Sequence, residues 1–196
     1  MEYYYMVIGV VFVAAFIIIL VMINSKSSNM RKEQTEINNN VKTLLHGNDN
    51  FKHGKILYLN DYATFDQDNV CKKFIAIDIE NKKVGLVDYE KKSLMVVGFD
   101  EILNYEIYEN GTNQTFGGAV GWFGSGIFGA ETEGVCKELK LIIRLNRYDI
   151  SQICYEIIYD NFLGVDKTSK PYKQCIATLQ EAVSFLEVVK SENSKK

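Results

Sequence analysis

The pattern of hydrophobic positions changes twice along this chain, and its first part is a long apolar run. Eighteen uncharged and almost wholly apolar residues, Met6–Ile23, begin five residues after the start. At about 1.5 Å per residue a helix of this length nearly spans a hydrocarbon core of about 30 Å. The run therefore predicts a transmembrane anchor over residues 1–23, with aromatic residues at one interface. The residues expected at the membrane are Tyr3, Tyr4, Tyr5, Met6 and Ile23.

The flanks of the run predict its orientation. No Lys or Arg precedes it, whereas Lys26, Arg31 and Lys32 follow it. A cleaved signal peptide would need a basic segment before the run, so an uncleaved anchor fits better. The positive-inside rule then predicts a single-pass protein of the cell membrane, with its N-terminus outside and its C-terminal domain in the cytoplasm.

Residues 24–54 form a polar juxtamembrane linker with one short amphipathic stretch. Ile37, Val41, Leu44 and Leu45 recur at helical spacing, which predicts a short helix between Thr35 and Leu45. This helix either packs on the following domain or pairs with a second chain as a coiled coil. Fewer than three heptads favour the first alternative.

The period changes to that of β-strands from Lys55 onward, and residues 55–190 are expected to form one β domain. Short apolar or alternating runs are separated by turn-like residues, which predicts mostly antiparallel strands. The expected strands cover residues 55–59, 74–79, 84–87, 93–97, 103–108, 138–145 and 153–159, with a short transition at 99–102.

The last part of the pattern is helical again. Its apolar positions follow the spacing of an amphipathic helix. Ser169 is a candidate N-cap, Pro171 suits the first turn, and residues 191–196 are expected to be a disordered tail. The sequence thus predicts a mainly β fold with helices, in which an antiparallel barrel or bent sheet is closed by this helix. Its apolar positions are Cys175, Ile176, Leu179, Ala182, Val183, Leu186 and Val189.

The order of strands followed by one helix resembles a pleckstrin-homology-like barrel. The stretches 83–90, 99–111 and 135–145 are more narrowly similar to a family of small bacterial and prophage proteins with a Gly-rich insert. The resemblance covers roughly residues 70–190. Relatives often carry a C-terminal oligomerisation module called SHOCT, which has no counterpart here. The resemblance implies a fold and no defined activity, and no basic phosphoinositide-binding motif supports lipid recognition by the domain.

Charge and cysteine content narrow the classes of partner. The formal net charge is −3. A protein that binds nucleic acid usually has a strongly basic face, and this composition does not indicate one. The four cysteines are widely spaced with no CxxC pair, which agrees with a reducing compartment. Nucleic acid is therefore not an expected partner, and no small-molecule substrate is evident.

A glycine-rich insert at residues 117–134 is the least ordinary part of the sequence. Its core, 117–130, holds six of the 14 glycines and the single tryptophan. A GxGxxG match lies within it, but a strand follows where a dinucleotide site needs a helix. Three alternatives remain: a loop covering the open end of the barrel, a segment dipping into the bilayer, or a partner-docking surface. Its candidate contact residues are Trp122, Phe123, Ile127 and Phe128.

No constellation of residues points to catalysis, a cofactor or a metal. His46 and His53 lie in a polar stretch, and the loop carboxylates Asp61, Asp66 and Asp68 miss the EF-hand spacing. Cysteines in apolar patterns are expected in the core. A row of basic residues is expected on a solvated strand face, with phosphate binding as the minor alternative. These residues are Lys137, Lys140, Arg144 and Arg147.

The sequence therefore predicts a non-enzymatic, membrane-anchored interaction or scaffold protein. Its expected partners are the membrane, through the N-terminal helix, and an unknown protein or a second copy of itself. Trp122 and Phe123 are the first residues expected at the contact. The alternative is a membrane-perturbing effector, prophage- or defence-linked, that acts through the Gly-rich segment.

Overall fold

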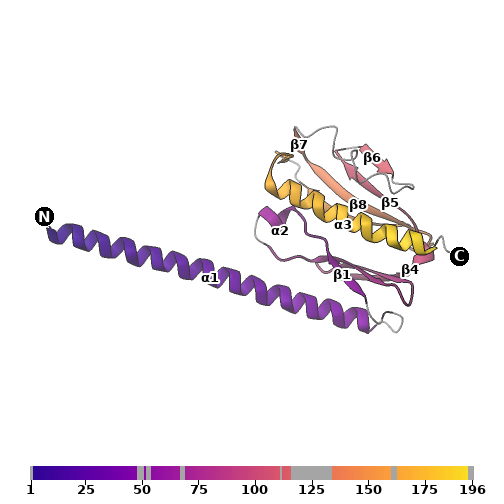
Figure 1. Ribbon diagram of the computed structural model, residues 1–196, viewed down its shortest axis with the longest axis horizontal. Coiled ribbons are helices and arrows are strands. Elements are labelled where there is room, and N and C mark those ends of the chain that lie inside the picture. The colour runs from indigo at the N-terminus through magenta and orange to yellow at the C-terminus, as the bar shows by residue number, and fades with distance from the viewer. Residues whose placement is uncertain are drawn as a thin grey trace.

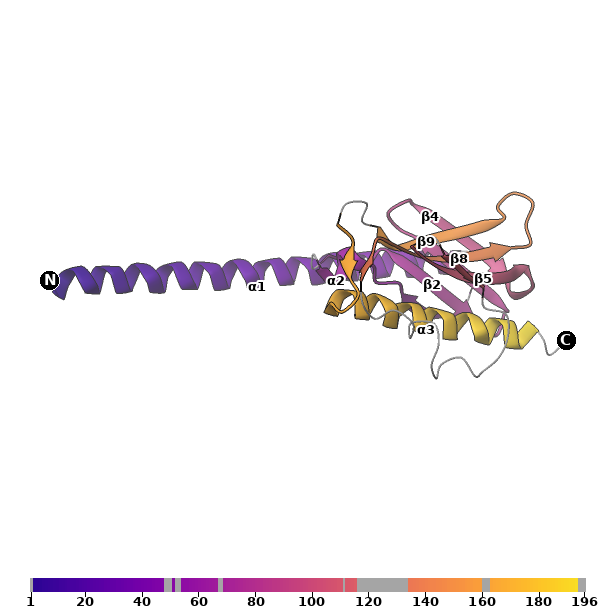
Figure 2. The same cartoon turned by 90° about the horizontal axis from the view of Figure 1, so that it is seen from above.

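The first element is a helix far longer than the pattern predicts. A computed structural model describes residues 2–47, 51, 54–66, 69–110, 112–115, 134–159 and 163–193; among these, the side chains of 2–15, 64, 66 and 112–115 are not described. Helix α1 (Glu2–His46) runs without a break through the expected linker. Figures 1 and 2 show its N-terminal part projecting far beyond a body made of the remaining elements.

Two four-stranded antiparallel sheets form the body. Sheet A has the order β1-β2-β3-β4 and sheet B has the order β6-β5-β8-β9. A two-stranded ribbon pairs β10 with β7. The strands are β1 (Lys55–Tyr58), β2 (Lys73–Asp78), β3 (Lys83–Asp88), β4 (Ser93–Gly98), β5 (Ile102–Glu109), β6 (Thr112–Thr115), β7 (Val135–Cys136), β8 (Glu138–Leu145), β9 (Gln152–Tyr159) and β10 (Val165–Asp166). The seven strands expected from the sequence correspond to β1–β5, β8 and β9.

Three further helices complete the fold: α2 (Tyr62–Asp66), the 3-10 turn η1 (Phe99–Glu101) and α3 (Lys170–Asn193). The predicted C-terminal helix is confirmed, and the Ser169 hydroxyl accepts the N–H of Tyr172 (3.3 Å) as an N-cap. In Figure 1, α3 lies between the side of β5 and β8 and the side of β1. Its apolar stripe fills the open side of the sandwich. The seven apolar positions predicted for it are all buried.

The two β-hairpins of sheet A use the same turn. Asp78 accepts the N–H of Asn81 (3.1 Å) and Asp88 accepts the N–H of Lys91 (3.1 Å). The residues that close these turns, Lys82 and Lys92, have φ of 51° and 52°. An aspartate that bonds its own turn three residues on favours this geometry, so the register of β2, β3 and β4 is fixed locally.

The sheets do not close into a barrel, which corrects the predicted fold class. At the seam between them, β9 lies against the start of β2 through side chains rather than a backbone ladder. Lys73 Nζ donates to the Glu156 carbonyl (2.7 Å), and the Tyr155 hydroxyl donates to the Phe74 carbonyl (3.3 Å). Because these contacts run through side chains and the described strands of the two sheets form no common ladder, the architecture is an open sandwich of two sheets.

The prediction of a membrane anchor is also wrong, because it requires a helix that is both long and apolar. No helix within the described part of the chain is long and apolar enough to cross a membrane. A spanning helix needs about 20 consecutive, predominantly apolar residues. The single-pass localisation inferred from the anchor is contradicted with it. The side chains of Tyr3, Tyr4, Tyr5 and Met6 lie outside the described part.

The C-terminal third of α1 packs on the outer face of sheet A. Ile37, Val41 and Leu45 are at most 4% exposed and join Phe74 and Val87 in one cluster. Leu44, predicted on the same stripe, is 49% exposed. The first of the two alternatives for this helix, packing on the domain, is therefore confirmed.

A hollow in sheet A receives the end of this stripe. Ala76 and Gly85 are directly opposed on β2 and β3. A Cβ placed on Gly85 would come within 2.5 Å of Leu45 Cδ2. The small pair thus lets α1 approach the sheet closely, which larger residues would prevent.

We expect Gly85→Ala and Leu45→Ala to be coupled. Overpacking makes the first cost about 1–3 kcal/mol, and a cavity makes the second cost about 2–5 kcal/mol. In the double variant the added methyl group occupies space that Leu45 leaves, so the costs should fall short of additivity by about 0.5–3 kcal/mol. Urea unfolding followed by circular dichroism measures this. Leu44→Ala is the matched control, and additive costs would show that the two side chains do not meet.

Candidate interaction surface on the projecting helix

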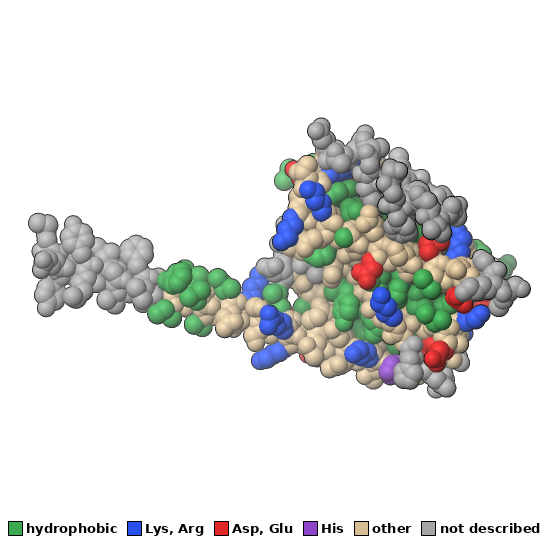
Figure 3. All heavy atoms as spheres, viewed as in Figure 1, with side chains coloured by type: hydrophobic (Ala, Val, Ile, Leu, Met, Phe, Trp, Pro, Cys, Tyr) green, Lys and Arg blue, Asp and Glu red, His purple; other side chains and the backbone are tan. Residues whose placement is uncertain are grey.

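The projecting part of α1 exposes a continuous apolar surface. Each of the eight side chains from Phe16 to Ile23 is between 50% and 68% exposed. They surround the helix on all sides, because consecutive residues advance by about 100°. Figure 3 shows this group of hydrophobic side chains standing clear of the body, with basic side chains between the two. Ile23, one of the predicted anchor residues, is 62% exposed here.

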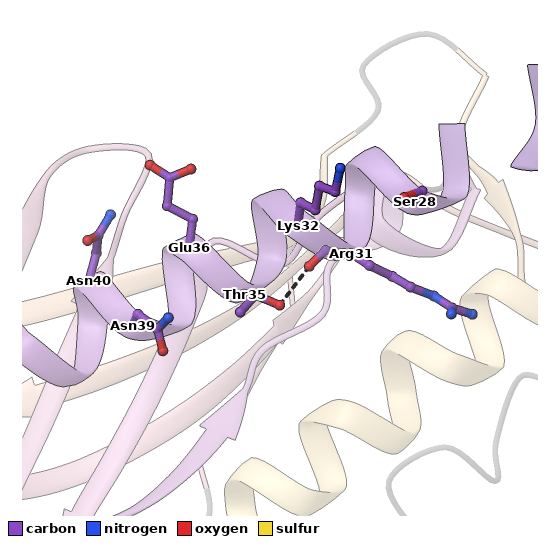
Figure 4. A pocket seen from close by; sticks show the side chains of 7 residues that line it. All are labelled: Ser28, Arg31, Lys32, Thr35, Glu36, Asn39 and Asn40. Atoms are coloured by element: carbon purple, nitrogen blue, oxygen red, sulfur yellow. Dashed lines mark hydrogen bonds between the residues drawn. The ribbon is translucent and has the colours of Figure 1, made fainter. Parts of the chain in front are cut away.

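The next part of α1 presents a polar groove. Ser28, Arg31, Lys32, Thr35, Glu36, Asn39 and Asn40 line it, and all of them come from this one helix (Figure 4). The hydroxyls of Thr35 and Thr43 donate to the carbonyls of Arg31 (2.8 Å) and Asn39 (2.9 Å), so they are engaged within the helix. The groove is an open helix surface with the composition of a solvated face.

Two amide side chains of α1 bind residues that flank sheet A, Cys71 just before β2 and Tyr89 just after β3. The Gln34 side chain donates to the Cys71 carbonyl (3.1 Å) and accepts the Cys71 N–H (2.7 Å), as a neighbouring strand would. Asn40 donates to the Tyr89 hydroxyl (3.1 Å). Because these bonds and the buried stripe fix the helix over residues 34–45, the apolar surface at 16–23 is presented at a defined position.

Three of the four basic residues predicted on this strand face, Lys140, Arg144 and Arg147, are bound by carboxylates. Arg144 donates to Glu106 through Nε (2.7 Å) and a terminal nitrogen (3.2 Å). Lys140 pairs with Glu138 and lies 3.6 Å from Glu156. Arg147, beyond the end of β8, donates to Asp149 twice, at 2.9 Å. Since each of these three cations already has an acidic partner within the chain, the ion pairs favour a structural role for these residues over phosphate binding.

A buried polar cluster joins the end of β5 to the start of α3. Glu109 accepts from Lys167 Nζ (3.1 Å) and from the Tyr172 hydroxyl (3.0 Å). Burial, with the negative charge of Glu109, raises the pKa of Tyr172 above its usual range. An ammonium group and a neutral phenol together satisfy a carboxylate that is largely removed from water. We therefore interpret this cluster as structural: it joins β5 to α3.

The thiols are protonated residues of the core. Burial raises the pKa of Cys71, Cys136 and Cys175 to about 12 in each case. Burial also raises the pKa of the half-buried Cys154. A thiolate is the nucleophilic form, and a thiol with a raised pKa supplies almost none of it near pH 7.

The predicted contact residues of the Gly-rich segment, Trp122, Phe123, Ile127 and Phe128, lie outside the described residues. The structure does describe Asn110, at the end of β5, and the residues from Gly134 onward, which lie on either side of this segment. The side chain of Asn110, which has φ of 45°, accepts the N–H groups of Lys137 (2.8 Å) and Glu138 (3.3 Å) and donates to the Val135 carbonyl (2.9 Å). One amide therefore joins the two ends of the stretch between β5 and β8.

The two histidines and three loop aspartates of the sequence analysis lie only partly within the described residues. His46 ends α1, and His53 lies outside the described residues. Asp61 accepts Lys73 Nζ at 2.7 Å, whereas the side chains of Asp66 and Asp68 are not described. Across the described ranges, no group of three His, Cys, Asp or Glu residues is arranged to hold a metal ion.

Comparison with known proteins returned no matching family model, no matching curated protein and no matching solved structure. The resemblance to pleckstrin-homology-like bacterial proteins is therefore untested.

We expect alkaline pH to destabilise the fold through its buried thiols. Above the ordinary thiol pKa of 9.0 the unfolded chain loses protons that the folded chain keeps up to about 12. Stability is therefore fully present below pH 9 and falls as the pH rises toward 12, by up to about 1.4 kcal/mol per pH unit for each thiol. Changing Cys71, Cys136 and Cys175 to Ala should flatten the dependence of urea midpoints between pH 9 and 11. An unchanged slope would contradict the thiol assignment.

We expect Asn110 to stabilise the neck of the Gly-rich segment in two separable ways. Asn110→Gly keeps the backbone conformation and loses the side-chain hydrogen bonds, at a cost of about 0.5–1.5 kcal/mol. Asn110→Ala adds the strain of a positive φ, about 1 kcal/mol more. Thermal unfolding should therefore rank the proteins as wild type, Gly, then Ala. An alanine variant more stable than the glycine variant would contradict this account.

Proposed function

We propose that this chain is a non-catalytic protein-interaction module that binds a protein partner through the projecting part of α1. The observation that carries the proposal is the exposure of eight consecutive apolar side chains, Phe16–Ile23, on a helix anchored to a folded body. Exposed apolar patches of this kind mark interaction sites, because apolar surface removed from water stabilises a complex.

The mechanism supported by the geometry is presentation of a preformed helix. The bonds between Gln34 and Cys71 and the buried residues Ile37, Val41 and Leu45 fix the base of α1 before any partner arrives. A helix held in advance loses less conformational entropy on binding than a disordered segment would. An amphipathic or apolar groove of a partner is the surface that accepts such a helix.

The earlier assignment of the contact to Trp122 and Phe123 stays a prediction, and it competes directly with the α1 surface. The same holds for the alternative of a membrane-perturbing effector, which would act through the same Gly-rich segment.

We expect Phe16→Ser, Leu20→Ser and Ile23→Ser together to abolish capture of the partner. The triple variant removes apolar area and leaves the domain, which lies more than ten residues away in sequence, unchanged. Crosslinking in cells followed by pull-down and mass spectrometry of the full chain measures capture.

Two comparisons make the experiment decisive. Ser28→Ala with Asn39→Ala changes the polar groove of the same helix and should leave capture intact. Trp122→Ala with Phe123→Ala tests the competing site. If capture persists in the α1 triple variant and disappears in the Trp122 and Phe123 variant, the proposal is wrong and the Gly-rich segment is the contact.

A further inference from the structure

We propose that Met22 is an oxidation site that regulates partner binding by α1: a peroxide converts its thioether to the sulfoxide, and the sulfoxide weakens capture of the partner. The inference rests on the function proposed above, because Met22 lies within the apolar surface Phe16–Ile23. It is drawn from the exposure of Met22, from its neighbours on the helix and from the burial of the other described methionines.

Met22 is the most accessible side chain of this apolar surface. It is 68% exposed, whereas the other seven residues are between 50% and 62% exposed. It is also the single sulfur-containing residue of Phe16–Ile23. The hydrophobic group that contains it stands clear of the body in Figure 3. Because so much of the side chain is in contact with water, an oxidant reaches it without any opening of the fold.

The other methionines whose side chains are described are less accessible. Met30 is half-buried and packs against the cluster that joins α1 to sheet A. Met95 is half-buried and packs against the main core. The side chains of Met1 and Met6 lie outside the described part of the chain. The structure therefore favours Met22 over Met30 and Met95 as the first of the three to be oxidised.

The chemical step needs a peroxide and no catalytic residue. The sulfur of Met22 attacks one oxygen of hydrogen peroxide with an electron pair, the O–O bond breaks, and an S–O bond forms. The second peroxide oxygen takes up the protons and leaves as water. Sulfur is oxidised and the peroxide is reduced. A methionine sulfoxide reductase, with a thiol as reductant, removes the oxygen again, so the modification is reversible.

The sulfoxide changes the surface where an apolar partner would bind. Lys26 is exposed, lies four residues after Met22 and lines the same groove of α1. Residues four apart are neighbours on a helix, so the lysine ammonium is within reach of the new sulfoxide oxygen. An apolar groove of a partner must either strip this polar group of its water and its lysine or bury it without a partner. Such a penalty weakens binding on the order of tenfold.

The body of the protein should not sense the modification. Met22 belongs to neither of the two core clusters and lies on the projecting part of α1. Oxidation therefore changes the binding surface and leaves the packing of α1 on sheet A in place.

The first test locates the oxidation. The full chain is treated with hydrogen peroxide, and tandem mass spectrometry of its peptides follows each methionine with time. We expect the sulfoxide of Met22 to accumulate before those of Met30 and Met95, while circular dichroism stays unchanged. Oxidation of Met22 that is no faster than that of the two half-buried residues would overturn the proposal.

The second test measures capture by crosslinking and pull-down, with each protein compared with its own untreated sample. Peroxide should lower capture by the wild type on the order of tenfold, and treatment with the reductase should restore it. Met22→Leu removes the sulfur and keeps an apolar side chain of similar volume, so its capture should not fall on treatment. Met30→Leu is the matched control, because it retains Met22 and should respond as the wild type does.

A third protein avoids the oxidant altogether. Met22→Gln places an unbranched polar side chain at the same position and should lower capture without peroxide. This variant excludes effects of peroxide on the thiols of the body.

The outcomes separate this inference from the function proposed above. If treated Met22→Leu loses as much capture as the treated wild type, or if oxidised wild type captures normally, regulation through Met22 is wrong. When the triple serine variant abolishes capture in the same experiment, the proposed function still stands. If the triple serine variant captures normally, the α1 surface is not the partner site, and both proposals are wrong.

Discussion

Sheet A has two apolar faces, and the other layers are arranged to cover both. Ile75 and Ile77 face sheet B and α3, whereas Phe74 and Ala76, the alternate residues of the same strand, face α1. Every residue of β2 is buried as a result. Water on either side would leave one of these rows exposed, so the sheet is stable only with a layer on each face. The C-terminal third of α1 is therefore part of the fold, not an appended stalk.

The seam between the sheets is held by polar groups that lie within the body. Lys73 is 8% exposed and bonds both Asp61 and the Glu156 carbonyl. The Tyr155 hydroxyl bonds the Phe74 carbonyl beside it. A buried lysine is tolerated because its ammonium group has these partners. These side-chain contacts join β9, an edge of sheet B, to β2, an interior strand of sheet A that already pairs with β1 and β3.

The surfaces of the body thus differ in whether their polar and apolar groups already have partners within the chain. Basic residues on β8 are matched by carboxylates, and the polar cluster around Glu109 is internally bonded. By contrast, the apolar side chains of α1 beyond the body, Phe16–Ile23, are exposed, as in surfaces that complexes typically bury.

Local pattern alone determined the four strands of sheet A, the strands β5, β8 and β9 of sheet B, and the whole apolar stripe of α3. The turns after Asp78 and Asp88 depend on neighbouring residues, and the stripe from Cys175 to Val189 depends on helical period, so both are readable from the chain. The tertiary structure decided features that the spacing of apolar residues along the chain does not determine. It buried Leu45 and exposed Leu44, because the hollow at Ala76 and Gly85 lies under only one of them. It also decided the continuity of α1, the order of strands and the open seam, since these depend on contacts between residues far apart in sequence. The same reason applies to the candidate surface: the apolar run of α1 is visible in the sequence, but the attachment of its base depends on contacts with Cys71, Phe74 and Val87, which lie far along the chain.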